Sequence, residues 1–245
     1  MVFNSIDFLF FLPIVFIFYW FFGSRNITLQ NSIILFSSYL FYGWWDWRFL
    51  SLIIFSTVLD FLLARKIHNS KSIRKKYFLI SSIIINLGIL GFFKYFNFFV
   101  SSLQASFLSL GLDLDTWSLN IILPVGISFY TFQTLSYSID VYNEKLKPTN
   151  DFISYAAFVS FFPQLVAGPI ERATNLLPQF ISKRNFNSTN AINGLSLILY
   201  GLVKKVVIAD RLAIYVNSVF NDFQSYNSFS LLIAVVFFSF QIYCD

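Results

Sequence analysis

Residues 121–142 read IILPVGISFYTFQTLSYSIDVY, an apolar run of membrane-spanning length that carries a regular polar stripe. The stripe consists of Gly126, Tyr130, Gln133, Tyr137 and Asp140, at spacings of four, three, four and three. On a helix these steps return to a single face. If that face met lipid, the aspartate alone would cost about 2.5–3.5 kcal/mol on membrane-insertion scales. We therefore expect a helix whose stripe faces protein or a water-filled cavity.

The composition of the whole chain is that of a membrane protein. Of its 245 residues, 57% are hydrophobic and 12% are charged, whereas a soluble domain carries about 25% charged residues. We expect an all-α polytopic membrane protein with one membrane domain over residues 1–245. The single cysteine, Cys244, excludes an internal disulfide framework and any CxxC metal site. The net charge of +5 does not indicate nucleic-acid binding, because six of the basic residues lie together in residues 65–76, between two apolar runs.

Eight apolar segments are candidate membrane spans. They are roughly residues 8–22, 31–45, 49–64, 77–93, 121–142, 152–170, 191–209 and 228–243. The basic loop 65–76 predicts a cytoplasmic position under the positive-inside rule, and it can also lie against anionic headgroups. This orientation places the N-terminus and the acidic loop 111–115 outside, and returns Lys145 and Lys147 to the cytoplasm. Residues 96–110 mix apolar and polar side chains and are expected to form an interfacial amphipathic helix.

Two topologies remain open after Asp151. Pro163 and Gly168-Pro169 interrupt the apolar segment 152–170, and the basic residues that follow favour the cytoplasm. A re-entrant hairpin that turns at Pro163 or at Gly168-Pro169 fits both observations slightly better than a crossing. Such a backbone is tolerated at membrane depth only where protein or water satisfies its polar groups.

Polar residues at membrane depth are the natural candidates for a site. Apart from the stripe they include Asp60, Lys204, Lys205 and Asp210. The paired lysines either snorkel to an interface or hold an anionic donor. The candidate residues for a cavity or a donor site are Tyr130, Gln133, Tyr137, Asp140, Gln164, Glu171, Arg172, Lys204, Lys205 and Asp210. No Ser–His–Asp set, metal cluster or phosphate-binding glycine loop is present, and the only histidine, His68, lies in the basic loop. No catalytic residue is therefore assigned.

Five strings along the chain resemble the membrane-bound O-acyltransferase (MBOAT) family, in the branch of the bacterial alginate O-acetylation membrane proteins. They are FYGWWDWRFL at 41–50, LPVGISFYTFQ at 123–133, FFPQLVAGPIER at 161–172, GLVKKVVIAD at 201–210 and FQIYCD at 240–245. The resemblance implies a multi-helix fold with a central cavity, in the inner membrane of a bacterium. An acyl group, commonly acetyl, would pass from a cytoplasmic thioester such as acetyl-CoA to an extracytoplasmic polysaccharide such as alginate. A partner acetyltransferase outside the membrane often takes part in this branch.

The resemblance also implies what this chain does not contain. The family's catalytic histidine is a general base, and it lies beyond the string that matches residues 240–245, in a motif without a counterpart here. His68 does not match it. We therefore expect the N-terminal portion of an acyltransferase, without the catalytic half and inactive alone. The alternative is a non-catalytic membrane transporter or scaffold, for which a polar stripe and a broken helix are equally natural.

Overall fold

The computed structural model describes residues 3–23, 26–111, 121–165, 168–169 and 171–245. The described part of the chain is helical and contains no strand, which confirms the predicted all-α class. The chain divides into two compact units. The first holds Phe11–Arg184, and the second holds Val2–Phe10 and Asn185–Asp245.

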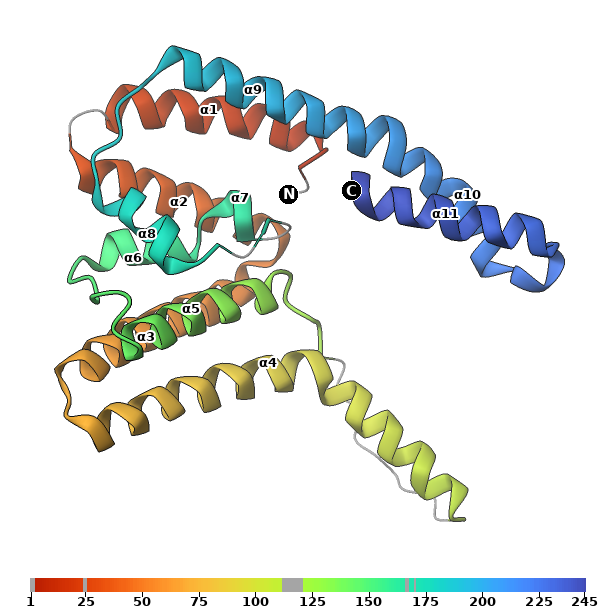
Figure 1. Cartoon of the computed structure of the whole chain (residues 1–245), viewed down its shortest axis with the longest axis horizontal. Coiled ribbons are helices and arrows are strands. Elements are labelled where there is room, and N and C mark those ends of the chain that lie inside the picture. Colours follow the sequence, from red (N-terminus) through yellow and green to blue (C-terminus); the bar gives the residue numbers. More distant parts are fainter. Residues whose placement is uncertain (1–2, 24–25, 112–120, 166–167, 170) are drawn as a thin grey trace. The chain divides into compact units, whose positions relative to one another are not determined.

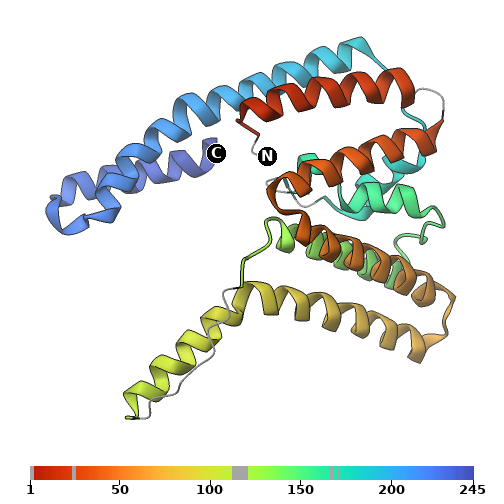
Figure 2. The same cartoon turned by 180° about the vertical axis from the view of Figure 1, so that it is seen from behind.

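The first unit is a helical bundle (Figure 1, Figure 2). Its elements are α1 (Ile6–Gly23, which begins in the second unit), α2 (Ile27–Asp46), η1 (Trp47–Phe49), α3 (Leu50–Asn69), α4 (Ser72–Ser109), α5 (Ile127–Tyr142), α6 (Phe152–Val159), α7 (Phe162–Leu165) and α8 (Ala173–Ile181). α3 and α4 run antiparallel, whereas α5 runs parallel to α3 and α6 runs parallel to α2. α5 packs against both α3 and α4, and α6 packs against α2 and α8. The core lies between these helices, and its largest fully buried side chains include Tyr130, Tyr137 and Tyr155.

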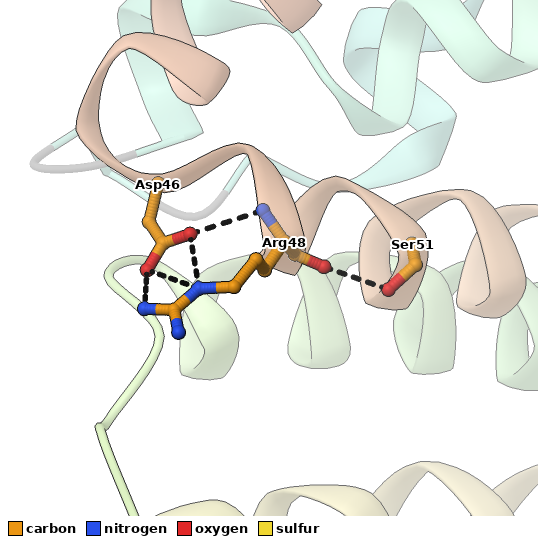
Figure 3. Close-up of polar contacts among 3 residues, drawn as sticks. All are labelled: Asp46, Arg48 and Ser51. Carbon is orange, nitrogen blue, oxygen red and sulfur yellow. Dashed lines mark hydrogen bonds and ion pairs between the residues drawn. The ribbon is translucent and has the colours of Figure 1, made fainter.

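A short 3-10 turn, η1, joins α2 to α3 and is fixed by one carboxylate. Asp46 accepts hydrogen bonds from the Arg48 backbone N–H at 3.0 Å and from the guanidinium at 2.6–3.1 Å. Ser51 Oγ donates to the Arg48 carbonyl at 2.8 Å, at the start of α3 (Figure 3). Trp47, the first residue of this turn, and Trp44, shortly before it, are exposed, as expected for an aromatic belt at a membrane interface.

Four helices in the described ranges are long and apolar enough to cross a membrane. They are Ile6–Gly23, Ile27–Asn69 (α2 and α3 with η1 between them), Ser72–Ser109 and Ser188–Asn221. Residues 96–110, expected as a separate interfacial helix, continue α4. Their polar residues do not interrupt the backbone hydrogen bonds, so the helix runs on. At 38 residues α4 is about 57 Å long, well beyond the ~30 Å hydrocarbon core, and Figure 1 shows that it changes direction along its length. Most of the predicted outer loop 111–115 lies outside the described residues.

The second unit contains two long helical stretches. Its elements are α9 (Ser188–Leu202), η2 (Val203–Ala209), α10 (Asp210–Asn221), η3 (Phe223–Ser225) and α11 (Ser228–Cys244). α9, η2 and α10 form one continuous helix, in which η2 is π-helical. α11 packs against α10 and η2. The predicted span 228–243 is confirmed as a helix, whereas the helix predicted over 191–209 extends to Asn221.

Candidate functional site

The polar stripe lies inside the first unit. Tyr130, Gln133, Tyr137 and Asp140 are all on α5, and the most exposed of them, Asp140, is only 7% accessible. The expectation that this face meets protein is confirmed. The helix is shorter than predicted, however, because Gly126 adopts a left-handed conformation (φ +74°) immediately before α5. The predicted span 121–142 is therefore helical only from Ile127.

The segment that packs on the stripe consists of α6, α7 and α8, and its two ends lie next to each other. Asn31 Nδ2 donates hydrogen bonds of 2.7 Å to Ser154 Oγ, at the start of α6, and to the carbonyl of Phe180, at the end of α8. Ser154 Oγ also donates to that carbonyl at 3.2 Å. α6 has eight residues, so it is about 12 Å long and cannot span a bilayer. The path of α6, α7 and α8 is therefore that of a hairpin, which is the shape that the re-entrant prediction requires.

The stripe supplies polar partners along the length of this hairpin. The hydroxyl of Tyr137 accepts a hydrogen bond from the Thr149 backbone N–H at 3.2 Å, near the base. Gln133 Nε2 donates to the carbonyl of Phe158 at 2.9 Å, near the end of α6. Carbonyls at a helix end have no partner within the helix, and water is absent from the hydrocarbon core. Tyr137 and Gln133 therefore satisfy backbone groups that a broken segment leaves open.

At the tip of the hairpin, the backbones of two segments nearly touch. A Cβ added to Gly126 would lie 2.3 Å from the carbonyl oxygen of Leu165 in α7. Gly168 is similarly close to Gln164, where a Cβ would lie 2.7 Å from the Gln164 Cα. Gly126 thus allows the tip to pack against the start of α5, and Gly168 allows a close approach to Gln164 within the tip.

Several buried polar atoms in this unit have no hydrogen-bond partner among the described residues. Three of them belong to elements that meet around the tip, namely Tyr42 Oη, Tyr130 Oη and Gln164 Oε1. Asp140 Oδ2 and Tyr155 Oη are also unpartnered. Most buried polar atoms in proteins are paired, so such atoms mark places where a polar ligand or water finds a partner.

We expect Gln133→Leu to destabilise the protein by about 1–2 kcal/mol, because the Phe158 carbonyl is left buried without its donor. Phe132→Leu is the matched control, since Phe132 is the neighbouring residue on α5 and is 46% exposed. Thermal unfolding of both variants in mild detergent measures the difference. Equal midpoints for the two variants would show that the Gln133 hydrogen bond does not hold the hairpin.

A second polar face of α5 was not predicted from the sequence. Asp60 of α3 is fully buried and accepts hydrogen bonds from Ser82 Oγ, from Asn86 Nδ2 at 2.7 Å and from Ser138 Oγ at 3.2 Å. The network continues through Ser56 Oγ, which donates to Asn86 Oδ1 at 2.8 Å. Asp60 was recognised as a polar residue at membrane depth, but its partners were not. The available signal was the row of small hydroxyl residues at 131, 134 and 138, with helical spacing.

The base of the hairpin is closed by a further cluster that sequence reasoning missed. Gln30 and Asn31 are completely buried on α2. Gln30 exchanges hydrogen bonds with the Arg184 backbone at 2.7 and 3.1 Å, and Asn31 Oδ1 accepts from the Arg184 guanidinium. Burial lowers the pKa of Arg184 from its usual value. Adjacent amides in an apolar run were the signal that could have revealed this cluster.

Not all predicted site residues join the stripe. Gln164 lies at the hairpin tip, whereas Glu171 and Arg172 lie between α7 and α8 and form no ion pair with any described residue. His68 is exposed at the end of α3. Within the described ranges no group of His, Cys, Asp and Glu side chains could hold a metal ion.

The remaining predicted residues lie in the second unit, at the π-helix. Lys205 Nζ pairs with Asp210 at 3.2 Å and also with Asp245. Residues five apart do not face each other on an α-helix, but the wider π-helical turn brings Lys205 and Asp210 together. Lys204 Nζ lies 4.6 Å from the Tyr200 ring centroid and 4.9 Å from that of Tyr243. Two carboxylates already neutralise Lys205, which makes it a poor site for an anionic donor.

The chain is similar to several curated proteins over most of its length. It is 41% identical over 224 residues to a probable alginate O-acetylase, AlgI, of Pseudomonas syringae pv. tomato, covering 90% of this chain and 42% of that protein. It is 40% identical to the corresponding protein of Pseudomonas aeruginosa, with coverages of 87% and 41%. It is 34% identical to a peptidoglycan O-acetyltransferase of Helicobacter pylori, with coverages of 100% and 51%.

The chain spans about half the length of the curated relatives it matches. No family model matches it, and no solved structure matches it significantly. The names of the relatives nevertheless confirm the resemblance to bacterial O-acetylation membrane proteins that the five strings predict.

Proposed function

From its homology with these O-acetyltransferases, we propose that the chain forms the membrane framework of an MBOAT-type O-acetyltransferase. The reaction transfers an acetyl group from a cytoplasmic thioester, with acetyl-CoA as the donor, to a hydroxyl of an extracytoplasmic polysaccharide. The thioester C–S bond breaks, an ester C–O bond forms, and the hydroxyl proton leaves with the thiol. The observation that carries this proposal is the identity of 34–41% to named O-acetyltransferases over most of the chain. None of these comparisons favours a transporter or a scaffold.

The acceptor is a cell-surface glycan. The relatives are named for alginate and for peptidoglycan, and both are polymers of sugars with free hydroxyls. We propose an acceptor of this class, reached with a partner acetyltransferase outside the membrane. The enzyme would lie in the inner membrane of a bacterium, with the N-terminus outside and the basic loop 65–76 in the cytoplasm.

One ion pair is consistent with the number of crossings in this topology. Lys75, at the start of α4, donates a hydrogen bond of 2.7 Å to Glu144, just after α5. This bond lowers the pKa of the Glu144 carboxyl. The basic loop and the turn after α5 therefore lie on the same side of the first unit, as the predicted topology requires.

The polar stripe and the hairpin would shape the path of the substrates, while the general base would come from elsewhere. The chain contains one histidine, and this residue, His68, is exposed in the basic loop, far in sequence from the stripe. We propose that Tyr130 and Gln164, with their unpartnered buried atoms, contact a polar substrate at the hairpin tip. We also propose that the 245 residues alone do not transfer acetyl groups.

Disruption of the gene tests the proposed function. We expect the cells to lose ester-linked acetate from their surface polysaccharide, measured as acetate released by mild alkali. The intact gene supplied in trans should restore the acetate. An unchanged acetate content in the disrupted strain would contradict the proposal.

Tyr130→Phe separates a substrate contact from a packing role. Its hydroxyl is buried and has no hydrogen-bond partner in the part of the chain that the structure describes, so removing it should leave stability unchanged or slightly raised. If the hydroxyl contacts substrate, surface acetate should fall at least about tenfold, as expected for the loss of one polar contact worth about 1.4 kcal/mol. Tyr137→Phe is the control, because its hydroxyl accepts the Thr149 N–H and its loss should lower stability by about 1 kcal/mol. Wild-type acetate levels with Tyr130→Phe would exclude this contact.

A further inference from the structure

An open pocket lies at the turn between α3 and α4, where two helices of membrane-spanning length meet. Its volume is about 410 Å³. Three cationic residues line it, Arg65, Lys66 and Arg74, together with two small polar residues and the apolar side chains of Leu62 and Phe78. The pocket is remote in sequence from the stripe and the hairpin, and it plays no part in the proposed acetyl transfer.

The positive charge of this pocket is not neutralised within the part of the first unit that the structure describes. Arg65, Lys66 and Arg74 are exposed and form no ion pair with a described residue. Lys75, which also lies in the loop, forms an ion pair with Glu144. Residues 65–76 include no acid. The pocket thus offers three cations to an external anion.

The backbone adds further donors at the same place. α4 begins after Lys71, and no side chain caps its first turn. The amide groups of Arg74 and Lys75 bond to the Lys71 carbonyl, whereas the first amides of a helix lack partners within it. The N-terminal end of a helix favours anions through these amides and the helix dipole. This effect reinforces the charge of the side chains.

The apolar wall of the pocket indicates that the anion carries a hydrophobic chain. Lys66 Nζ lies 5.5 Å from the centroid of the Phe78 ring, so a cation and an aromatic face lie side by side in the lining of the pocket. Leu62 is 50% exposed one turn deeper along α3. A ligand bound here meets cations at its head and apolar side chains along the two helices.

We propose that this pocket binds the phosphate of an anionic phospholipid. Basic pockets between helices at the cytoplasmic surface of a membrane suit such headgroups. A soluble phosphate ester could bind the same cations, but it has no hydrophobic chain to contact the apolar wall. The apolar wall therefore favours a lipid as the ligand.

Native mass spectrometry of the purified chain in detergent, titrated with phosphatidylglycerol or phosphatidylcholine, tests this site. The wild-type chain should bind phosphatidylglycerol at least tenfold more tightly. The triple variant Arg65→Gln/Lys66→Gln/Arg74→Gln should bind phosphatidylglycerol about 100-fold more weakly, since each interfacial cation contributes roughly fivefold. The control Lys145→Gln/Lys147→Gln/Lys183→Gln removes the same charge from exposed positions elsewhere and should change the affinity less than twofold.

Three results would overturn the proposal. They are equal affinities for the two lipids, equal losses in the triple variant and its control, and full displacement of phosphatidylglycerol by adenosine 3′,5′-bisphosphate, which would identify a site for soluble phosphate esters. If the triple variant aggregates, Arg74→Gln alone should weaken binding about fivefold, and an unchanged affinity would refute the site.

Discussion

Gly126→Ala should destabilise the protein by about 3 kcal/mol or more. A left-handed conformation costs a residue with a Cβ about 1–2 kcal/mol. The new methyl carbon would also lie 2.3 Å from the Leu165 carbonyl oxygen, a distance that only a backbone shift can relieve. For a chain of this size, the loss corresponds to a fall in Tm of about 6–12 °C, measured by thermal unfolding in mild detergent.

Gly88→Ala is the matched control for this experiment. Gly88 lies within α4, and a Cβ built there meets no atom within 4 Å. Alanine in place of glycine inside a helix should stabilise the protein by about 0.5–1 kcal/mol. The two variants add the same methyl group and should shift Tm in opposite directions. A shift of the same sign and size in both would show that the approach of Leu165 to Gly126 does not exist in solution.

The hairpin was partly predictable because two kinds of signal agreed. An amide and a carboxylate within the apolar run 121–142 have no low-energy position except against protein, so the direction of the stripe could be deduced from spacing alone. Pro163 and Gly168-Pro169 similarly indicated a break. What the sequence did not show is that Gln133 and Tyr137 bind the backbone of the broken segment itself.

The Asp60 network shows why other contacts could not be predicted. Ser81 and Ser82 are adjacent and chemically identical, yet Ser81 Oγ bonds to the Tyr77 carbonyl of its own helix, whereas Ser82 Oγ bonds to Asp60. A serine on a membrane helix can always satisfy itself within that helix. Its presence therefore does not indicate which face is buried, and only the packing of α3, α4 and α5 decides the partner.

The same limit applies to contacts between distant segments. Gln30 and Arg184 are 154 residues apart, and no periodicity links them. Similarly, nothing in the residue types of Val203–Ala209 predicts that this segment forms a π-helix. The π-helix nevertheless determines the partners of Lys205. From the sequence, this lysine could either snorkel to an interface or bind an anion.

Asp60→Leu should lower the free energy of unfolding by about 2–5 kcal/mol. The substitution leaves three buried donors without their acceptor, on Ser82, Asn86 and Ser138. Orphaned buried donors cost about 1–3 kcal/mol each, although hydrogen bonds between membrane helices average only about 0.6 kcal/mol, which sets the lower end. The same change favours membrane insertion of α3 by about 3 kcal/mol. The variant should therefore insert well but unfold at a lower temperature in detergent.

A series at this position distinguishes a structural role from a functional one. Asp60→Asn retains one acceptor oxygen but adds an amide N–H₂ group that faces donors. Its stability should therefore lie between those of the wild type and of Asp60→Leu. Asp222→Asn is the control for the amide, because Asp222 is exposed and should change stability by less than about 0.5 kcal/mol. If Asp60→Leu keeps the wild-type Tm while surface acetate disappears, Asp60 acts on a substrate. If Asp222→Asn is the most stable variant, Asp60→Asn is intermediate and Asp60→Leu is the least stable, the carboxylate holds α3, α4 and α5 together. Any loss of acetate then follows from loss of folded protein.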